Sequence, residues 1–220
     1  MKKNGKREWL VGSMLILAFA VWTVLVQSVD VQPVGPQGTE VGFASVNRWF
    51  HKLTGAHMSL YTITDWMGLI PVFVCMIFGG IGFVQLVKRR SLFRVDYDIL
   101  CLGIYYVIVI FGYLIFEIIP VNYRPILIEG FLEGSYPSST TLLVLSVIPT
   151  LSFQIKRRVK MAALKNSICI LGSLFSTFMV TGRLISGVHW LTDIIGSVML
   201  SAGLFCIYKA VVLRFYKEEN

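Results

Sequence analysis

The chain has 220 residues, of which 55% are hydrophobic and 15% charged, and its formal net charge is +8. Its mean hydropathy of +0.72 lies far above the range of soluble globular domains and indicates an integral membrane protein. The basic residues form short, separated clusters beside apolar runs, which argues against nucleic acid as a partner.

Long uncharged apolar runs divide the chain. Five of them are long enough to cross about 30 Å of hydrocarbon as helices. A sixth run, 194–208, reaches that length only if its helix begins near His189 and has Asp193 in its first turn. We therefore predict an all-α membrane bundle of about six transmembrane helices, forming one domain over residues 1–220. The five longer runs cover residues 9–29, 66–87, 99–116, 134–155 and 166–182.

The basic residues are distributed unevenly between the two ends of these runs. With six spans and a cytoplasmic N-terminus, 16 of the 20 Lys and Arg residues are cytoplasmic, as the positive-inside tendency requires. The first run has the basic start of a signal peptide, but its long apolar core and the lack of a small-residue cleavage site predict a retained helix. The small size and lack of extensions predict a bacterial cell-membrane protein. The basic residues on the outer side are Arg48, Lys52, Arg124 and Arg183.

The segment between the first two runs contains an amphipathic stretch. Its apolar residues Phe43, Val46, Phe50 and Leu53 recur at helical spacing, while Asn47, Arg48, His51 and Lys52 occupy the other face. This pattern predicts a short helix that either lies on the outer leaflet or caps the bundle. No carboxylate or thiol cluster accompanies the histidines, and the four cysteines lack metal-ligand spacing, so no metal site is expected.

Three ionisable residues lie within very apolar sequence near the end of the chain. If the residues from His189 onward are helical, His189 and Asp193 share one face, where the carboxylate can orient the imidazole. Arg183 offers a planar guanidinium suited to phosphate oxygens. Together they indicate nucleophilic attack on phosphorus. The alternative is a buried ion pair that links two helices.

Other polar residues fall on the same side of the membrane under this topology. Arg124 follows the third run, and the fourth begins with Pro137, Ser138, Ser139 and Thr140. A helix N-terminus with hydroxyl side chains offers donors to an anion, although the same residues also serve as an ordinary helix cap. The convergence of these residues with His189 favours an anion site.

The arrangement resembles the type 2 phosphatidic acid phosphatase family, six-span lipid phosphatases related to vanadium haloperoxidases and bacterial acid phosphatases. The motifs of that family are Lys-x6-Arg-Pro, Pro-Ser-Gly-His and Ser-Arg-x5-His-x3-Asp. Arg124-Pro125 matches the end of the first motif and Pro137-Ser138 the start of the second. The third is matched at its full spacing by Arg183, His189 and Asp193, and the resemblance covers roughly residues 60–210.

The resemblance implies a role for each matched residue. His189 would be the nucleophile that forms a phospho-histidine, with Asp193 as its orienting partner. The phosphoryl oxygens would be held by Arg124, Arg183 and Ser138, and the helix start adds Ser139 and Thr140. The expected activity is hydrolysis of a lipid phosphate or diphosphate at the outer membrane face, without a metal or cofactor. The sequence indicates no oligomeric state.

Four positions depart from the family pattern. Glu117 stands where the first motif has Lys, and Gly182 replaces the Ser before Arg183. Ser139 replaces the Gly of the second motif, and Thr140 replaces its His, which protonates the leaving group. The loss of that acid is worth about 10²–10⁴ in rate when the leaving group needs a proton. We therefore expect a preference for diphosphates, such as a polyprenyl diphosphate. Glu117 is either a substitute acid or a partner of an arginine. The alternative function is a weakly active or inactive member that binds lipid phosphates.

Overall fold

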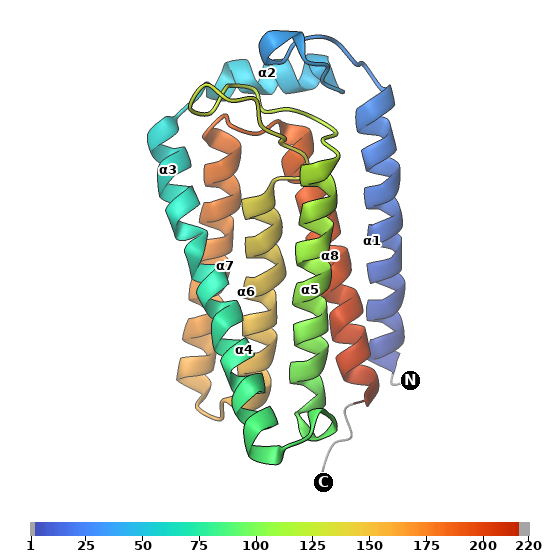
Figure 1. Cartoon of the computed structure of the whole chain (residues 1–220), viewed down its shortest axis with the longest axis vertical. Coiled ribbons are helices and arrows are strands. Elements are labelled where there is room, and N and C mark those ends of the chain that lie inside the picture. The colour runs from blue at the N-terminus through green and yellow to red at the C-terminus, as the bar shows by residue number, and fades with distance from the viewer. Residues whose placement is uncertain (1–2, 216–220) are drawn as a thin grey trace.

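Residues 3–215, which the computed structural model describes, form eight α-helices, two 3-10 turns and isolated bridges in place of β-strands. Six helical segments are long and apolar enough to cross a membrane, which confirms the predicted number of spans. They run roughly parallel to one axis (Figure 1). They are α1 (Lys3–Ser28), α3 (Met58–Met67) continued by α4 (Leu69–Arg89), α5 (Tyr97–Ile118), α6 (Ser139–Arg158), α7 (Ala162–Ile185) and α8 (Leu191–Phe215).

Helix α8 lies at the centre of the packing and contacts α1, α5 and α6. Its contact with α1 is close because both helices present glycines to each other. A Cβ on Gly12 would lie 2.9 Å from the carbonyl oxygen of Gly203, and a Cβ on Gly203 would lie 2.9 Å from Ile16. Small residues that let backbones approach are typical of helix pairs in membranes. The first and last helices therefore pair, and the start of α1 and the end of α8 lie at the same end of the bundle (Figure 1).

The second span begins earlier than predicted. The apolar run starts at Trp66, but helix α3 begins at Met58 and is followed by α4 after a single residue, Gly68. Helix α3 packs against α7, where a Cβ on Gly182 would lie 2.7 Å from the Thr64 methyl group. The glycine that replaces the family's serine thus allows α3 to lie against α7.

Two helices begin slightly later than predicted. Helix α6 begins at Ser139 rather than with Pro137 in its first turn, after an irregular segment from 119 to 138. Helix α8 begins at Leu191, so His189 precedes it in a turn. The cause is Gly187, whose φ of +70° suits glycine and where a Cβ would clash with the Gly55 carbonyl. Asp193 does lie in the first turn of α8, as predicted.

The amphipathic stretch forms α2 (Ala44–Thr54), which lies across the end of the bundle opposite the chain ends (Figure 1). Its polar face is partly turned inward. The Asn47 amide donates to the Thr192 hydroxyl (3.0 Å), and its oxygen accepts the Thr192 backbone N–H (3.3 Å). Val46, Trp49 and Leu53 are exposed instead. Helix α2 therefore caps the bundle while presenting an apolar surface outward.

Candidate active site

His189 lies in the turn between α7 and α8 and is 3% exposed. Its Nδ1 is 3.1 Å from the carbonyl oxygen of Ser135. Because a carbonyl can only accept, Nδ1 carries the proton in this hydrogen bond. The other ring nitrogen, Nε2, is buried and has no hydrogen-bond partner among residues 3–215. The neutral ring therefore presents an unshared electron pair on Nε2.

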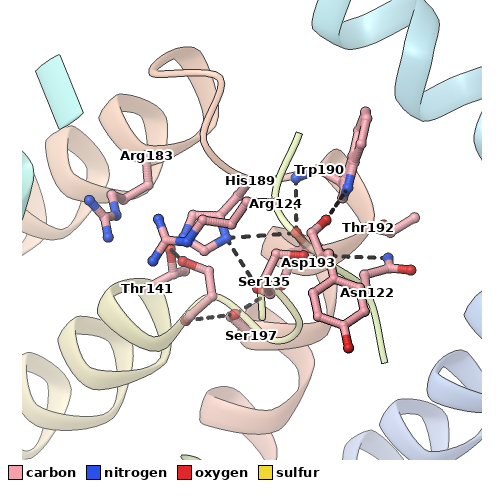
Figure 2. A network of polar contacts seen from close by, with 12 residues as sticks. Asn122, Arg124, Ser135, Thr141, Arg183, His189, Trp190, Thr192, Asp193 and Ser197 are labelled. Atoms are coloured by element: carbon pink, nitrogen blue, oxygen red, sulfur yellow. Dashed lines mark hydrogen bonds and ion pairs between the residues drawn. The ribbon is translucent and has the colours of Figure 1, made fainter. Parts of the chain in front are cut away.

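Asp193 is fully buried beside this ring, with Oδ2 3.6 Å from Nδ1 of His189. The same oxygen accepts the backbone N–H of Trp190 (2.9 Å), and Oδ1 accepts from the Asn122 amide (3.4 Å). A carboxylate in the first turn that accepts the N–H of the residue before the helix is half of a capping box. Asp193 thus holds the start of α8 and the position of the imidazole together (Figure 2).

The buried guanidinium group of Arg124 lies beside the ring and lines the same cavity, whereas that of Arg183, also buried, lies farther from the ring and points away from it (Figure 2). Both contact the face of Tyr61 on α3, with distances from Cζ to the ring centre of 5.7 Å and 4.8 Å respectively. Nη1 of Arg124 and Nε of Arg183 have no hydrogen-bond partner within the described part of the chain. A pair of buried cations with spare donors can hold the oxygens of a phosphoryl group.

These surroundings determine the charge of the imidazole. Burial, together with the positive charges of Arg124 and Arg183, lowers the pKa of His189 to about 4. The contact with the Asp193 carboxylate raises this pKa, but by less than the other effects lower it. The ring is therefore neutral near pH 7, which is the form that can attack phosphorus.

Carboxylates also approach the guanidinium groups. Arg124 Nε lies 3.0 Å from Oε2 of Glu133, and Arg183 Nη2 lies 3.4 Å from Oδ1 of the half-exposed Asp65. Glu117 lines the same cavity as His189 and Arg124, but the carboxylate found in the ion pair of Arg124 is that of Glu133. Each arginine therefore has a carboxylate partner, Glu133 for Arg124 and Asp65 for Arg183.

The cavity beside His189 has a volume of about 170 Å³ and is bordered by Arg124, Glu117, Glu133 and Ser139. A neighbouring cavity of about 300 Å³ is lined by Thr140 and Asp65, and Ser139 and Tyr113 border both. The other walls of this neighbouring cavity are largely apolar residues of α4, α5 and α6. The structure thus places Ser139 in the cavity of His189 and Thr140 in the adjoining one.

Ser138 is buried directly before α6. Its hydroxyl donates to the Thr141 hydroxyl (3.0 Å), and its carbonyl accepts the Ser197 hydroxyl (3.0 Å). Neither contact is with the arginines. Ser138 therefore connects the start of α6 with α8.

Several residues near the site were missed by the sequence prediction. Tyr61, Asp65, Asn122, Glu133 and the Ser135 carbonyl carry no motif, and the first two belong to a helix that the apolar run did not include. The loop position of Asn122 beside Arg124 was the one available signal. In residues 3–215, no three His, Cys, Asp or Glu side chains gather into a group that could hold a metal ion.

A family model of the PAP2 superfamily matches residues 105–217, in agreement with the resemblance seen in the motifs. A crystal structure of a transmembrane PAP2-type phosphatidylglycerolphosphate phosphatase from Bacillus subtilis has the same fold, with a TM-score of 0.69, 15% identity and coverage of 94% of this chain and 98% of that chain. A search of curated proteins found no significant match. The fold is therefore that of an integral membrane protein.

Proposed function

Because the chain belongs to the PAP2 superfamily, we propose that it is a membrane enzyme that hydrolyses a lipid phosphate or diphosphate through His189. The observation that carries this proposal is the unpartnered Nε2 of His189 in one cavity with the buried guanidinium group of Arg124, with the positive charge of Arg183 also acting on the ring. No described residue forms a hydrogen bond with Nε2 of His189, Nη1 of Arg124 or Nε of Arg183, and a phosphoryl group provides both an electrophile and acceptor oxygens.

In the proposed reaction, Nε2 attacks phosphorus and the bond from phosphorus to the leaving-group oxygen breaks. The products of this step are a phospho-histidine and the released alcohol or phosphate ester. Water then attacks phosphorus, which frees inorganic phosphate and restores the imidazole. Arg124 and Arg183 hold the phosphoryl oxygens, while the Ser135 carbonyl and Asp193 keep Nδ1 protonated and stabilise the charge that develops on the ring.

The stability of the leaving group determines which substrates the proposed site can cleave. A monoester expels an alkoxide, which must be protonated as the bond breaks, whereas a diphosphate expels a phosphate ester that leaves as an anion. Thr140 stands where the resemblance expects the acid, so the proposed substrates are lipid diphosphates, such as a polyprenyl diphosphate. The apolar walls of the Thr140 cavity suit an attached hydrocarbon chain.

Glu117 is a candidate substitute acid, because it borders the same cavity as His189. A protonated Glu117 would donate its proton to the leaving oxygen. On this proposal Glu117→Gln loses activity, most of all on substrates whose leaving group needs a proton. A Glu117→Gln variant with undiminished activity would remove Glu117 from the reaction.

We place the site on the outer face of a bacterial cell membrane. The support is the distribution of basic residues, which puts 16 of 20 at the end of the spans away from His189.

The decisive experiment compares phosphate release from a panel of lipid monophosphates and diphosphates by purified protein and by His189→Ala. His57→Ala is the matched control, since His57 is exposed and its Nε2 donates to the Thr54 carbonyl. We expect release by wild type and the control, and none by His189→Ala. Binding of these lipids without any release would favour the alternative function, a phosphate-binding protein whose arginines are occupied by Glu133 and Asp65.

A further inference from the structure

A third, larger cavity lies at the end of the bundle opposite His189. It has a volume of about 660 Å³ and is bounded by α6, α7 and α8. Its residues near the helix ends are Lys156, Arg157 and Lys209, which lie at the C-terminal ends of α6 and α8. His189 precedes the N-terminal end of α8. The 25 residues of α8 extend about 37 Å, so this cavity and the one beside His189 are at separate ends of the molecule.

The cavity exists because α7 packs against α6 and makes few contacts with α8. The approach to α6 occurs at Gly172, where a Cβ would lie 3.0 Å from Cγ2 of Ile148. Beyond this contact the three helices leave a groove with mainly apolar walls. These walls include Leu145, Ile148, Phe153 and Phe205.

Polar groups occur along the same groove. Ser152, Ser173 and Ser176 line it, as does Pro149 in the middle of α6. Proline has no N–H, so it cannot donate to the carbonyl of Leu145 one turn earlier. The groove thus offers hydroxyl groups within walls that suit a hydrocarbon chain.

Among residues 3–215, the end of the groove carries three cations, and the ion pairs described there involve two of them. Arg157 lies 3.8 Å from Asp98 and packs over the Phe153 ring at 5.4 Å, and Lys209 pairs with Glu8 at 2.7 Å. Lys156 is exposed and has no ion pair with any side chain described in the structure. Positive charge therefore remains beside an apolar groove.

We propose that this groove binds an anionic phospholipid from the leaflet at that end of the bundle. The lipid phosphate contacts Lys156 and Arg157 and lies near Lys209, and one acyl chain lies along the apolar walls of α6, α7 and α8. Basic pockets between transmembrane helices bind anionic head groups for this electrostatic reason. A soluble anion would leave the apolar walls uncovered. A zwitterionic lipid would gain less from the cations.

The test measures retained lipid by native mass spectrometry after reconstitution with equal amounts of phosphatidylglycerol and phosphatidylcholine of the same acyl chains. We expect wild type to retain mainly phosphatidylglycerol. Lys156→Gln should retain about fivefold less of it, the effect of one basic residue near an anionic lipid. Ser176→Leu places a larger side chain in the groove and should lower the retention of both lipids.

Matched controls lie next to the groove but outside its lining. Lys160→Gln removes a neighbouring charge, and Thr177→Leu enlarges the adjacent α7 position, whose hydroxyl donates to the Ser173 carbonyl. Both should retain lipid like wild type, and thermal unfolding identifies any variant that fails to fold. Equal retention of the two lipids by wild type would overturn the proposal. The proposal would also be overturned if Ser176→Leu retained as much lipid as wild type. It would likewise be overturned if Ser176→Leu changed the oligomeric state rather than the retention of lipid.

Discussion

Nδ1 of His189 lies 3.6 Å from Oδ2 of Asp193, although only Asp193 belongs to helix α8. The four-residue spacing therefore brings the two side chains together by a turn rather than along one helix face. The carboxylate reaches back to the Trp190 N–H as well as to the ring. Its orientation is thus set by the helix start, and this constraint also limits the movement of the imidazole.

The first prediction separates these two roles of Asp193. Asn retains an oxygen that can accept the Trp190 N–H, but it lacks the charge that stabilises an imidazolium. Asp193→Asn should therefore unfold at nearly the wild-type temperature and hydrolyse its substrate about 10²-fold or more slowly. Thermal unfolding and phosphate release measure the two effects. Asp193→Ala, which loses the helix contact too, should also be less stable by about 0.5–2 kcal/mol. A wild-type rate in Asp193→Asn would leave the carboxylate with only its structural role.

The second prediction concerns pH. The pKa of His189 is lowered to about 4, chiefly by burial, so the attacking ring stays neutral well below the ordinary value of 6.5. The acid limb of kcat/KM that belongs to the enzyme should lie near pH 4 and be common to monoester and diphosphate substrates. A limb that arises from ionisation of the substrate would instead lie at different pH values for the monoester and the diphosphate. A shared limb near pH 6.5 would contradict the burial of this ring.

Stability should follow the same ionisation. Between pH 6.5 and about 4 the unfolded chain binds a proton at His189 that the folded chain does not bind. The contribution of this residue to stability is therefore lost as the pH falls through that window. His189→Ala should show a weaker dependence there, and this difference provides the control for the assignment.

A third prediction concerns the ion pair of Arg124 with Glu133. Oε2 of Glu133 is 3.0 Å from Nε, and the carboxylate is partly exposed, so the pair is worth little in free energy. Vanadate mimics the five-coordinate phosphorus of the proposed reaction and should inhibit the enzyme. Glu133→Gln should release the guanidinium of Arg124 and lower the inhibition constant for vanadate by about two- to fivefold. Glu129→Gln, an exposed position in the same loop, is the control. Weaker vanadate binding by Glu133→Gln would show instead that Glu133 positions Arg124.

The fourth prediction restores the missing acid. Thr140→His should increase monoester hydrolysis by up to about 10²-fold and change diphosphate hydrolysis far less, because only the alkoxide needs a proton. Thr140→Ser keeps a hydroxyl and should leave the ratio of the two rates unchanged. Parallel increases for both substrates would mean that protonation of the leaving group does not determine the preference. Faster hydrolysis of phosphatidic acid than of a prenyl diphosphate by wild type would contradict the substrate proposal itself.

The fifth prediction concerns topology. Single cysteines at Trp49 in α2 and Lys160 between α6 and α7 are exposed positions at opposite ends of the bundle. After replacement of the four native cysteines, an impermeant maleimide on intact cells should label position 49 and not position 160. The reverse pattern would place the His189 site on the cytoplasmic side.

The sequence predicts the spans well because length and hydropathy are local properties. It also predicts that the side chains of His189 and Asp193 lie close together, as the structure has them. The start of α8 could not be predicted from the same residues. It depends on the contact of Gly187 with Gly55, which lies more than a hundred positions earlier in the chain.

The polar face of α2 illustrates the same limit. Asn47 has the periodicity of a solvent-facing residue, but it is 1% exposed because Thr192 lies opposite it. An amphipathic pattern distinguishes two helix faces without showing which one faces protein. When the buried partner is the polar start of another helix, the polar face is the one that turns inward.

The contact of Tyr61 with both arginines affects how this protein can be recombined with relatives. The family match begins at residue 105 and includes every motif residue, yet Tyr61, Asn47 and Gly55 all precede it. They contact Arg183, Thr192 and Gly187 respectively. A chimera joined at residue 105 would inherit His189 without the surfaces that hold its surroundings. Exchanges between family members should therefore transfer residues 44–67 together with the C-terminal half.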